Sequence, residues 1–388
     1  MQREGVCLVG YGEIPNAVPE AEGLKSSFSY LPYVAEAVSL ALDNAKIKKK
    51  DIDGFALVRL AFPADTPAVA EELGLELNWV QGVDCGGASA VIAVRRAADA
   101  IQLGQIDVAV CAAAAVRYRG YPFRGLPAYP TDNFMLPYGY GGPSSSFGLT
   151  ERRHMAQYGT TLEQLGKVVV SFRKNAELNE NALFRSPLTL DDYLNSRMIS
   201  DPIRLYDCVR PCTGAGAVVL ASEHIAKQIM KHPIYLVSDA EKANYQVDKP
   251  TADRTVTGFT ALGDELFSKV SRDEINFAQI YDDYPIAVLM QLEDLGFCQK
   301  GQGGQFIESH DITVHGDFPI NTGGGELSAG QAVGAGAMMH IVEAVRQLKG
   351  EAGAHQVKGA RTGLVTGLGL LGFDIPIMCA AAMILQRR

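Results

Sequence analysis

The stretch DCGGASAVIAVRRAADAIQLGQIDVAVCA, from Asp84 to Ala112, decides the fold. Within it, Ser89–Leu103 places apolar residues along one helical face, which predicts an amphipathic helix. The run Ile106–Val116 is almost wholly apolar and predicts a buried strand. Because the strand-like segment Trp79–Asp84 precedes the glycine turn, the sequence predicts a strand, a tight turn, a helix and a second strand in an α/β protein.

The same rhythm extends in both directions along the chain. In the C-terminal half, a turn of three glycines at 323–325 also leads into a helix and then a buried strand, which indicates an internal duplication. Further strands are expected over Gly5–Gly10, Gly54–Arg59, Ala215–Ala221, Ile234–Asp239, Phe277–Tyr281, Thr362–Leu371 and Met378–Leu385. Further helices are expected over Leu31–Ala45, Ala287–Leu295 and Gly334–Leu348.

The middle of the chain breaks this rhythm. Residues 118–215 begin with many prolines, tyrosines and glycines and continue with helical patterns around 148–180 and 189–198. A structured segment of this length is more than a connection and usually carries a lid or binding role. The sequence therefore predicts an N-terminal half over 1–117 and 201–232, an inserted loop domain over 118–200, and a C-terminal half over 233–388.

Composition excludes several classes of function. The 388 residues carry a formal net charge of −9 and no basic stripe, which disfavours nucleic-acid binding. No apolar run is long enough for a membrane helix, and no signal peptide is visible. Seven scattered cysteines without a CxxC pair predict reduced thiols in a cytoplasmic protein and no bound metal.

Cys85 is the strongest candidate for a reactive group. It lies between a predicted strand and a predicted helix and is followed by two glycines. Unpaired backbone N–H groups and the helix dipole at such a position favour the thiolate, and small neighbours admit a carbonyl group. The alternative, a structural cysteine in the core, stays open on placement alone.

Five segments together resemble the thiolase superfamily, in particular its sterol-carrier-protein-type branch. The turn at Cys85 resembles the nucleophile turn of that branch. The other four segments, in chain order, are Arg153-His154-Met155 with Tyr158-Gly159; Leu205-Tyr206-Asp207-Cys208 with Gly214 to Ala217; Tyr281-Asp282-Asp283-Tyr284 with Leu292 to Phe297; and Asn321 with Gly324-Gly325, Gly330-Gln331 and Gly334.

The resemblance implies a thiolase-like duplicated α/β fold. Two mixed-sheet halves would stack in α/β/α/β/α layers, with a loop domain inserted in the N-terminal half. It also implies a homodimer that uses acyl-CoA and coenzyme A as substrates and binds no further cofactor. Five residues would bind the substrate: His154, Asn321, Gly324, Gly325 and Gly369.

The departures from the family pattern concern proton transfer. Gln331 stands where the family has a histidine; glutamine can donate a hydrogen bond to an oxyanion but cannot supply a proton as imidazole does. The family's second cysteine would fall near Leu368, where no thiol stands. In the sterol-carrier branch the base occupies the slot of Asp283, and Tyr281 replaces that motif's histidine.

Asp283, Tyr281 and His154 are therefore the candidates for acid–base work. Two simpler interpretations remain open. The run from Tyr281 to Tyr284 can cap a helix and supply its acidic first turn. His154 can be a surface or helix-packing residue.

The reaction predicted from these features is cleavage or formation of a 3-oxoacyl-CoA through an acyl group on Cys85. The departures suggest a branched or aromatic substrate rather than acetoacetyl-CoA. An alternative is a thiolase-like aldolase that splits β-hydroxyacyl-CoA; such aldolases typically lack the cysteine and carry tyrosines in the slots of Tyr281 and Gln331. A scaffold that only binds acyl-CoA is the second alternative. The C-terminal pattern also resembles relatives that work with a small subunit containing an OB fold and a zinc ribbon.

Overall fold

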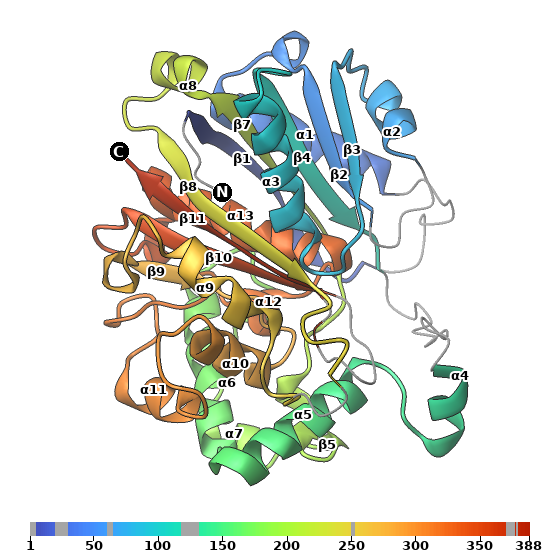
Figure 1. The fold of residues 1–388 in the computed structure, drawn as a ribbon, viewed down its shortest axis with the longest axis vertical. Helices are drawn as coiled ribbons and strands as arrows, with labels where there is room; N and C mark the ends of the chain where they lie inside the picture. The colour runs from blue at the N-terminus through green and yellow to red at the C-terminus, as the bar shows by residue number, and fades with distance from the viewer. Residues whose placement is uncertain are drawn as a thin grey trace.

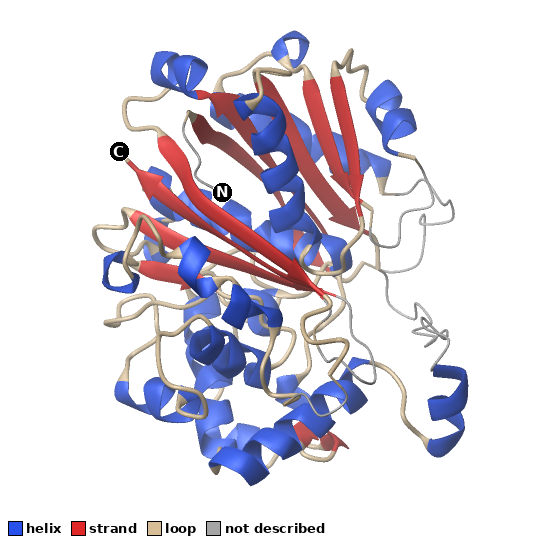
Figure 2. Cartoon of the chain, viewed as in Figure 1, coloured by secondary structure: helices blue, strands red, loops and turns tan. Residues whose placement is uncertain are grey.

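The strands of the main sheet fall into two halves (Figures 1 and 2). The computed structural model describes residues 5–19, 30–59, 65–117, 132–249, 253–369, 377 and 379–388. Its nine-stranded sheet has the order β3-β2-β4-β7-β1-β8-β11-β10-β9. The strands are β1 (Val6–Ala17), β2 (Gly54–Val58), β3 (Trp79–Val83), β4 (Val108–Ala115), β7 (Thr213–Ser222), β8 (Ile234–Ala243), β9 (Phe277–Gln279), β10 (Thr362–Gly369) and β11 (Cys379–Arg387).

The directions of strand pairing repeat between the halves. In the N-terminal half β2 pairs parallel with β4, β4 antiparallel with β7, and β7 antiparallel with β1. In the C-terminal half β9, β10, β11 and β8 follow the same sequence of directions. The halves join through a short pairing of β1 with β8, Cys7 with Tyr235 and Leu8 with Ile234. This shared topology agrees with an internal duplication.

Two helices lie between the half-sheets, and others cover the outer faces (Figure 1). Helices α3 (Ser89–Gln102) and α13 (Gly336–Lys349) each contact strands of both halves. Helix α1 (Leu31–Ala45) packs on the outer face of the N-terminal half, and α9 (Gly263–Leu266) packs on β8 and β11. The fold is therefore the predicted thiolase-like α/β arrangement in alternating layers.

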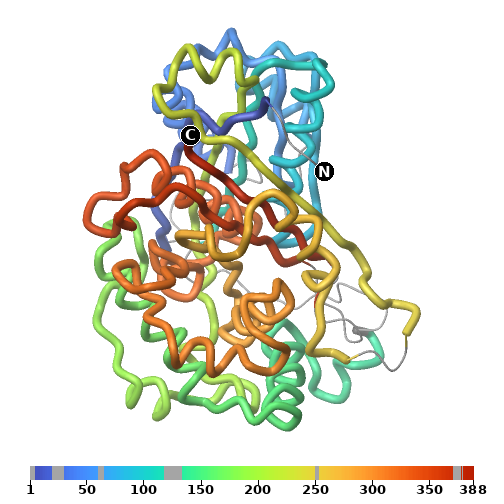
Figure 3. Tube along the Cα trace, turned by 60° about the vertical axis from the view of Figure 1, so that its left-hand side comes forward, coloured from blue at the N-terminus to red at the C-terminus, as the bar shows by residue number. Residues whose placement is uncertain are grey.

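The segment between β4 and β7 reaches across to the C-terminal half (Figure 3). Its described helices are α4 (Asp132–Met135), α5 (Pro143–Tyr158), α6 (Leu162–Glu177) and α7 (Leu190–Leu194), followed by the hairpin β5 (Met198–Ser200) and β6 (Ile203–Arg204). Helix α6 packs on α10 (Pro285–Asp294), α11 (Gly303–Ser309) and α12 (Gly325–Ala329). The predicted boundaries of this inserted segment stay a prediction.

Most predicted elements are present, with differences at their ends. The helical pattern around 148–180 is two helices, because Gly159 ends α5 in a left-handed conformation and Thr161 caps α6. The helix expected from Gly334 begins at Gly336, after a short 3-10 turn. The remaining α-helices among the described residues are α2 (Thr66–Glu72) and α8 (Glu223–Ile229). The predicted strand residues Leu370, Leu371 and Met378 lie outside the described residues.

Membrane insertion finds no support among the helices that the structure describes. None of them is both long enough and apolar enough to cross a bilayer.

Candidate active site

Cys85 lies in the turn between β3 and α3, half-buried. Its backbone N–H donates to Ser89 Oγ at 2.7 Å, so this amide is already engaged within the turn. The pKa of the thiol is lowered to about 7, chiefly by a hydrogen bond with Cys379, against the opposing effect of burial. The sequence predicted a lowered pKa from the helix end, whereas the largest cause in the structure is a second thiol.

Cys379 was missed as a functional residue by the sequence patterns. It begins β11 and pairs with Gly369 at the end of β10. Gly369 lies so close to the turn that an added Cβ would come within 1.8 Å of the Cys85 carbonyl oxygen. The pKa of the Cys379 thiol is raised, chiefly by its hydrogen bond with Cys85. The Cys379 thiol therefore keeps its proton and donates this hydrogen bond. A thiol from the neighbouring strand thus approaches Cys85, although the slot at Leu368 has none.

Tyr281 connects the C-terminal half with the nucleophile turn. Its side chain is buried, and its backbone N–H donates to Thr366 Oγ1 at 2.9 Å. A Cβ added at Gly87 would lie 2.3 Å from the Tyr281 hydroxyl oxygen, so that hydroxyl lies directly over the turn. Burial raises the pKa of Tyr281 well above its usual value, and the hydroxyl keeps its proton at neutral pH.

Asp283 and Gln331 lie next to each other in the same region. Gln331 Nε2 donates a long hydrogen bond, 3.4 Å, to Asp283 Oδ1. Burial raises the pKa of Asp283 to about 6, within the range useful to a general base. Helix α10 has Tyr284 as its N-cap, without a side-chain cap and without an acidic first turn. The simple capping interpretation of the Tyr281–Tyr284 run therefore does not hold for α10.

Asp282 caps a different helix, α12. Its carboxylate accepts the N–H groups of Glu326 at 2.8 Å and Leu327 at 3.1 Å. A Cβ added at Gly325 would lie 2.2 Å from Asp282 Oδ2, and Gly324 packs equally closely on α6. Gly324 and Gly325, which were predicted to approach a thioester, thus allow the start of α12 to pack closely around the buried Asp282 carboxylate.

Asn321 and His154 make contacts inside the protein. Asn321 Oδ1 accepts the Ile280 N–H at 2.7 Å and its Nδ2 donates to the Ile280 carbonyl at 2.8 Å, which fixes the chain entering Tyr281. His154 is fully buried, with Nδ1 2.7 Å from Thr160 Oγ1 and Nε2 3.1 Å from Glu293 Oε2. Both ring nitrogens of His154 are therefore occupied where α5 meets α10, as the helix-packing interpretation expects.

Glu326 is a second residue that the sequence patterns missed. It is 2% exposed, and burial with the nearby charges of Asp283 and Asp282 raises its pKa well above the usual value. Single atoms of Asp282, Glu326 and His340 lie within 4.8 Å of one another, a spacing that could hold a cation. Among the described residues this cluster offers three ligand atoms, and each Asp282 oxygen already accepts one backbone N–H group.

Two α/β halves of the same topology, with a thiol of lowered pKa at their junction, are the arrangement of a thiolase-type enzyme. Comparison with known proteins agrees: the model "Thiolase C-terminal domain-like" matches residues 241–387. A "Steroid side-chain-cleaving aldolase" of Thermomonospora curvata is 33% identical over 84% of this chain and 87% of its own. An "Acetyl-CoA acetyltransferase" of Methanothermobacter thermautotrophicus is 30% identical over 89% and 92%.

Among solved structures, the "Ltp2-ChsH2(DUF35) aldolase" superposes with a TM-score of 0.86 at 29% identity, covering 98% of this chain and 97% of that one. The chain belongs to the thiolase superfamily and is an enzyme of that superfamily.

Proposed function

We propose that the protein is a thiolase that cleaves or forms a 3-oxoacyl-CoA through an acyl group on Cys85. The observation that carries this proposal is the thiol pair, in which Cys379 lowers the pKa of Cys85 to about 7. A thiol with this pKa is substantially ionised at neutral pH, and the thiolate is the attacking species. The relative named as an acetyltransferase supports the same chemistry.

The groups around Cys85 fit the steps of this reaction. The thiolate attacks the 3-oxo carbonyl carbon, and the bond between C2 and C3 breaks with its electron pair left on C2. Asp283, in its protonated form, or the Tyr281 hydroxyl delivers a proton to that carbanion. Coenzyme A then gives up its thiol proton and takes the acyl group from Cys85. Gln331 and the Gly369 backbone are the proposed donors to the oxyanions.

An aldolase acting on a β-hydroxyacyl-CoA is the second candidate. It is favoured by the buried Tyr281 hydroxyl above the turn and by the relative named as a steroid side-chain-cleaving aldolase. In this reaction Asp283 takes the proton of the β-hydroxyl group, the bond between the α and β carbons breaks, and the resulting carbanion is protonated. Cys85 would then serve in binding rather than as an acyl carrier.

Substrate and assembly form part of the same proposal. Gln331 in the histidine slot favours a branched or aromatic acyl chain over acetoacetyl-CoA. The edge strand β3 exposes side chains, including Val80 at 40%, as expected of a strand covered in a homodimer. The solved relative named as a complex with a DUF35 protein supports a small OB-fold and zinc-ribbon subunit here. A cytoplasmic location agrees with seven cysteines that form no disulfide.

Intact-mass analysis separates these functions. The protein is incubated with acyl-CoAs, alone and with the small subunit, and compared with Cys85→Ala and with Cys298→Ala as a control. Cys298 is also half-buried, but burial raises its pKa to about 12. An acyl adduct lost only in Cys85→Ala supports the thiolase. Lyase activity that survives Cys85→Ala supports the aldolase, and the absence of both signals supports a binding scaffold.

A further inference from the structure

The Glu326 carboxyl group lies against Asp283 and Tyr281. Glu326 stands at the start of α12, and neither of its carboxyl oxygens has a hydrogen bond of normal geometry to a protein group. Buried polar atoms normally have such partners, and a buried carboxylate without them is costly. The group therefore requires a proton of its own or a bound cation.

The titratable groups around Glu326 come from separate parts of the fold. Asp282 is committed to the amides of α12 and lies 3.3 Å from His340 Nε2. This leaves Asp283 and the Tyr281 hydroxyl as the groups with which the Glu326 carboxyl can exchange a proton. The titratable side chains whose charges or contacts bear on Glu326 are Tyr281, Asp282, Asp283, His340 and Cys212.

The charges of this cluster decide where a proton resides. Three carboxyl groups, those of Asp282, Asp283 and Glu326, are gathered around His340. The pKa of Asp283 is raised to about 6, and burial and both neighbouring charges raise the pKa of Glu326 well above its usual value. At neutral pH a mostly ionised Asp283 therefore lies beside a protonated Glu326, an arrangement typical of acid–base pairs.

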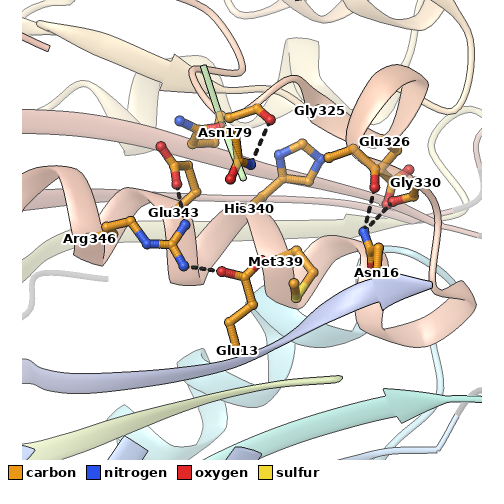
Figure 4. A pocket seen from close by; sticks show the side chains of 14 residues that line it. Glu13, Asn16, Asn179, Gly325, Glu326, Gly330, Met339, His340, Glu343 and Arg346 are labelled. Atoms are coloured by element: carbon orange, nitrogen blue, oxygen red, sulfur yellow. Dashed lines mark hydrogen bonds and ion pairs between the residues drawn. The ribbon is translucent and has the colours of Figure 1, made fainter. Parts of the chain in front are cut away.

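A small polar cavity lies on the other side of Glu326 (Figure 4). Its volume is about 40 Å³, and Glu326, His340, Asn16 and Asn179 contribute to its wall. A polar cavity of this size has room for ordered water. Glu326 thus contacts both this cavity and the Tyr281–Asp283 pair.

We propose that Glu326 is a proton-relay residue that acts through Asp283. The proton of Glu326 moves to the ionised Asp283, and Asp283 gives it to the carbanion. A C–H bond forms, the Glu326 O–H bond is lost, and Glu326 is left ionised. When coenzyme A releases its thiol proton, that proton returns through Asp283 to Glu326, so no proton is gained or lost in the cycle. The aldol reaction needs the same relay, with the β-hydroxyl group as the proton source.

The inference rests on the proposed function, and the experiment measures the two separately. Exchange of the α-protons of acetyl-CoA and propionyl-CoA with D₂O reports proton transfer at carbon. Acyl transfer from the same thioesters to Cys85 involves no proton transfer at carbon, and the coenzyme A thiolate that leaves can take its proton from water. We expect Glu326→Gln to lower the exchange rate about 100-fold while acylation stays within about 3-fold of wild type. Absence of acylation in both proteins counts against the thiolase alone.

Glu151 supplies a matched control. It is fully buried, its pKa is raised to about 9, and both of its carboxyl oxygens lack hydrogen-bond partners, but it lies on α5 beside Asp207. We expect Glu151→Gln to leave exchange unchanged. We further expect exchange by the wild type to decline at alkaline pH, as Glu326 loses its proton, and Glu326→Gln to abolish this decline. If this variant does not fold, Glu326→Asp, which keeps a titratable group, is expected to retain part of the exchange.

Three results would overturn the relay. Glu326→Gln could exchange at the wild-type rate, or the wild type could show no exchange with either thioester. Wild-type exchange could instead be lost with a chelator and restored by Mg²⁺ or Zn²⁺, which would make the cluster a metal site.

Discussion

The two halves use the turn at the end of their edge strand in opposite ways. In the N-terminal half the turn after the edge strand β3 presents Cys85 at the junction, where Ser89 Oγ accepts its backbone N–H and Cys379 is hydrogen-bonded to its thiol. In the C-terminal half the turn after the edge strand β9 sends Asp282 inward, where it binds the first amides of α12. One turn is built to expose a nucleophile and the other to fix acid–base groups. The two halves therefore share a strand topology, and a few side chains give each half a different chemical role.

The largest effect is expected from adding a methyl group between the two turns. In Gly87→Ala the new Cβ would lie 2.2 Å from Tyr281 Cζ, so the tyrosine and the turn must separate. A displacement of about 1 Å in such a site can lower kcat about 100-fold. Steady-state turnover of the preferred thioester measures the change. Gly148→Ala, whose Cβ would meet its nearest neighbour at an ordinary 3.4 Å, is expected to stay within about 2-fold of wild type.

The next largest effect concerns the inward turn. Asp282→Asn removes the charge that two α12 amides share and leaves one of them poorly paired, so we expect the free energy of unfolding to fall by about 2–3 kcal/mol. Urea denaturation measures it. Asp192, which accepts the Thr189 N–H at the exposed start of α7, gives the matched change Asp192→Asn, with an expected loss below about 1 kcal/mol. Equal losses in the two variants would contradict the buried role of Asp282.

A smaller effect is expected at the exposed turn. Cys379→Ala removes the hydrogen bond that lowers the pKa of Cys85. The pKa of Cys85 should therefore rise toward the ordinary value, and its thiolate fraction at pH 7 should fall. Because a more basic thiolate is also a better nucleophile, the net loss in alkylation rate is about 5-fold. Peptide mapping after timed iodoacetamide labelling measures Cys85 alone. An unchanged rate would show that the helix end, rather than Cys379, activates the thiol.

The smallest effect is a pH dependence of stability. A carboxyl group with a raised native pKa binds more protons in the native than in the unfolded state, so it lowers stability as pH rises from the unfolded value of about 4.3 toward the native one. Glu326→Gln removes this effect. The Tm of the variant minus that of wild type should therefore increase between pH 4.5 and 7, by about 2–4 °C. A Tm difference that does not vary with pH would show that the Glu326 carboxyl group does not hold a proton in the native state.

Local patterns were sufficient to predict most of the fold. The helix Leu31–Ala45 begins and ends where its apolar periodicity places it, and β4 follows from its uninterrupted apolar run. The ends of strands that depend on contacts with residues distant in the sequence were not predictable from local patterns. The strand expected over Phe277–Tyr281 is assigned only as far as Gln279, and Asn321 binds the backbone at Ile280.

The site was predictable where a residue's own neighbours in sequence reveal its role. Cys85 stands before a helix and Asp283 in a family slot, and the sequence made both of them candidates. Cys379 lies at the start of an ordinary-looking strand, and only its register with Gly369 brings it to Cys85. Glu326 follows a glycine turn whose residues already account for a tight turn before a helix. Its burial against Asp283 could therefore be recognised only in the tertiary structure.

The position of Cys379 in β11 also bears on how the protein is made. A ribosome adds this strand long after Cys85 has emerged, so the nascent chain carries Cys85 as an ordinary, slowly reacting thiol. Full reactivity arises only when the hairpin of β10 and β11 docks beside the turn. On the function proposed for Cys85, this timing keeps the thiol less reactive toward oxidants and electrophiles during synthesis, and thiol reactivity then reports that folding is complete.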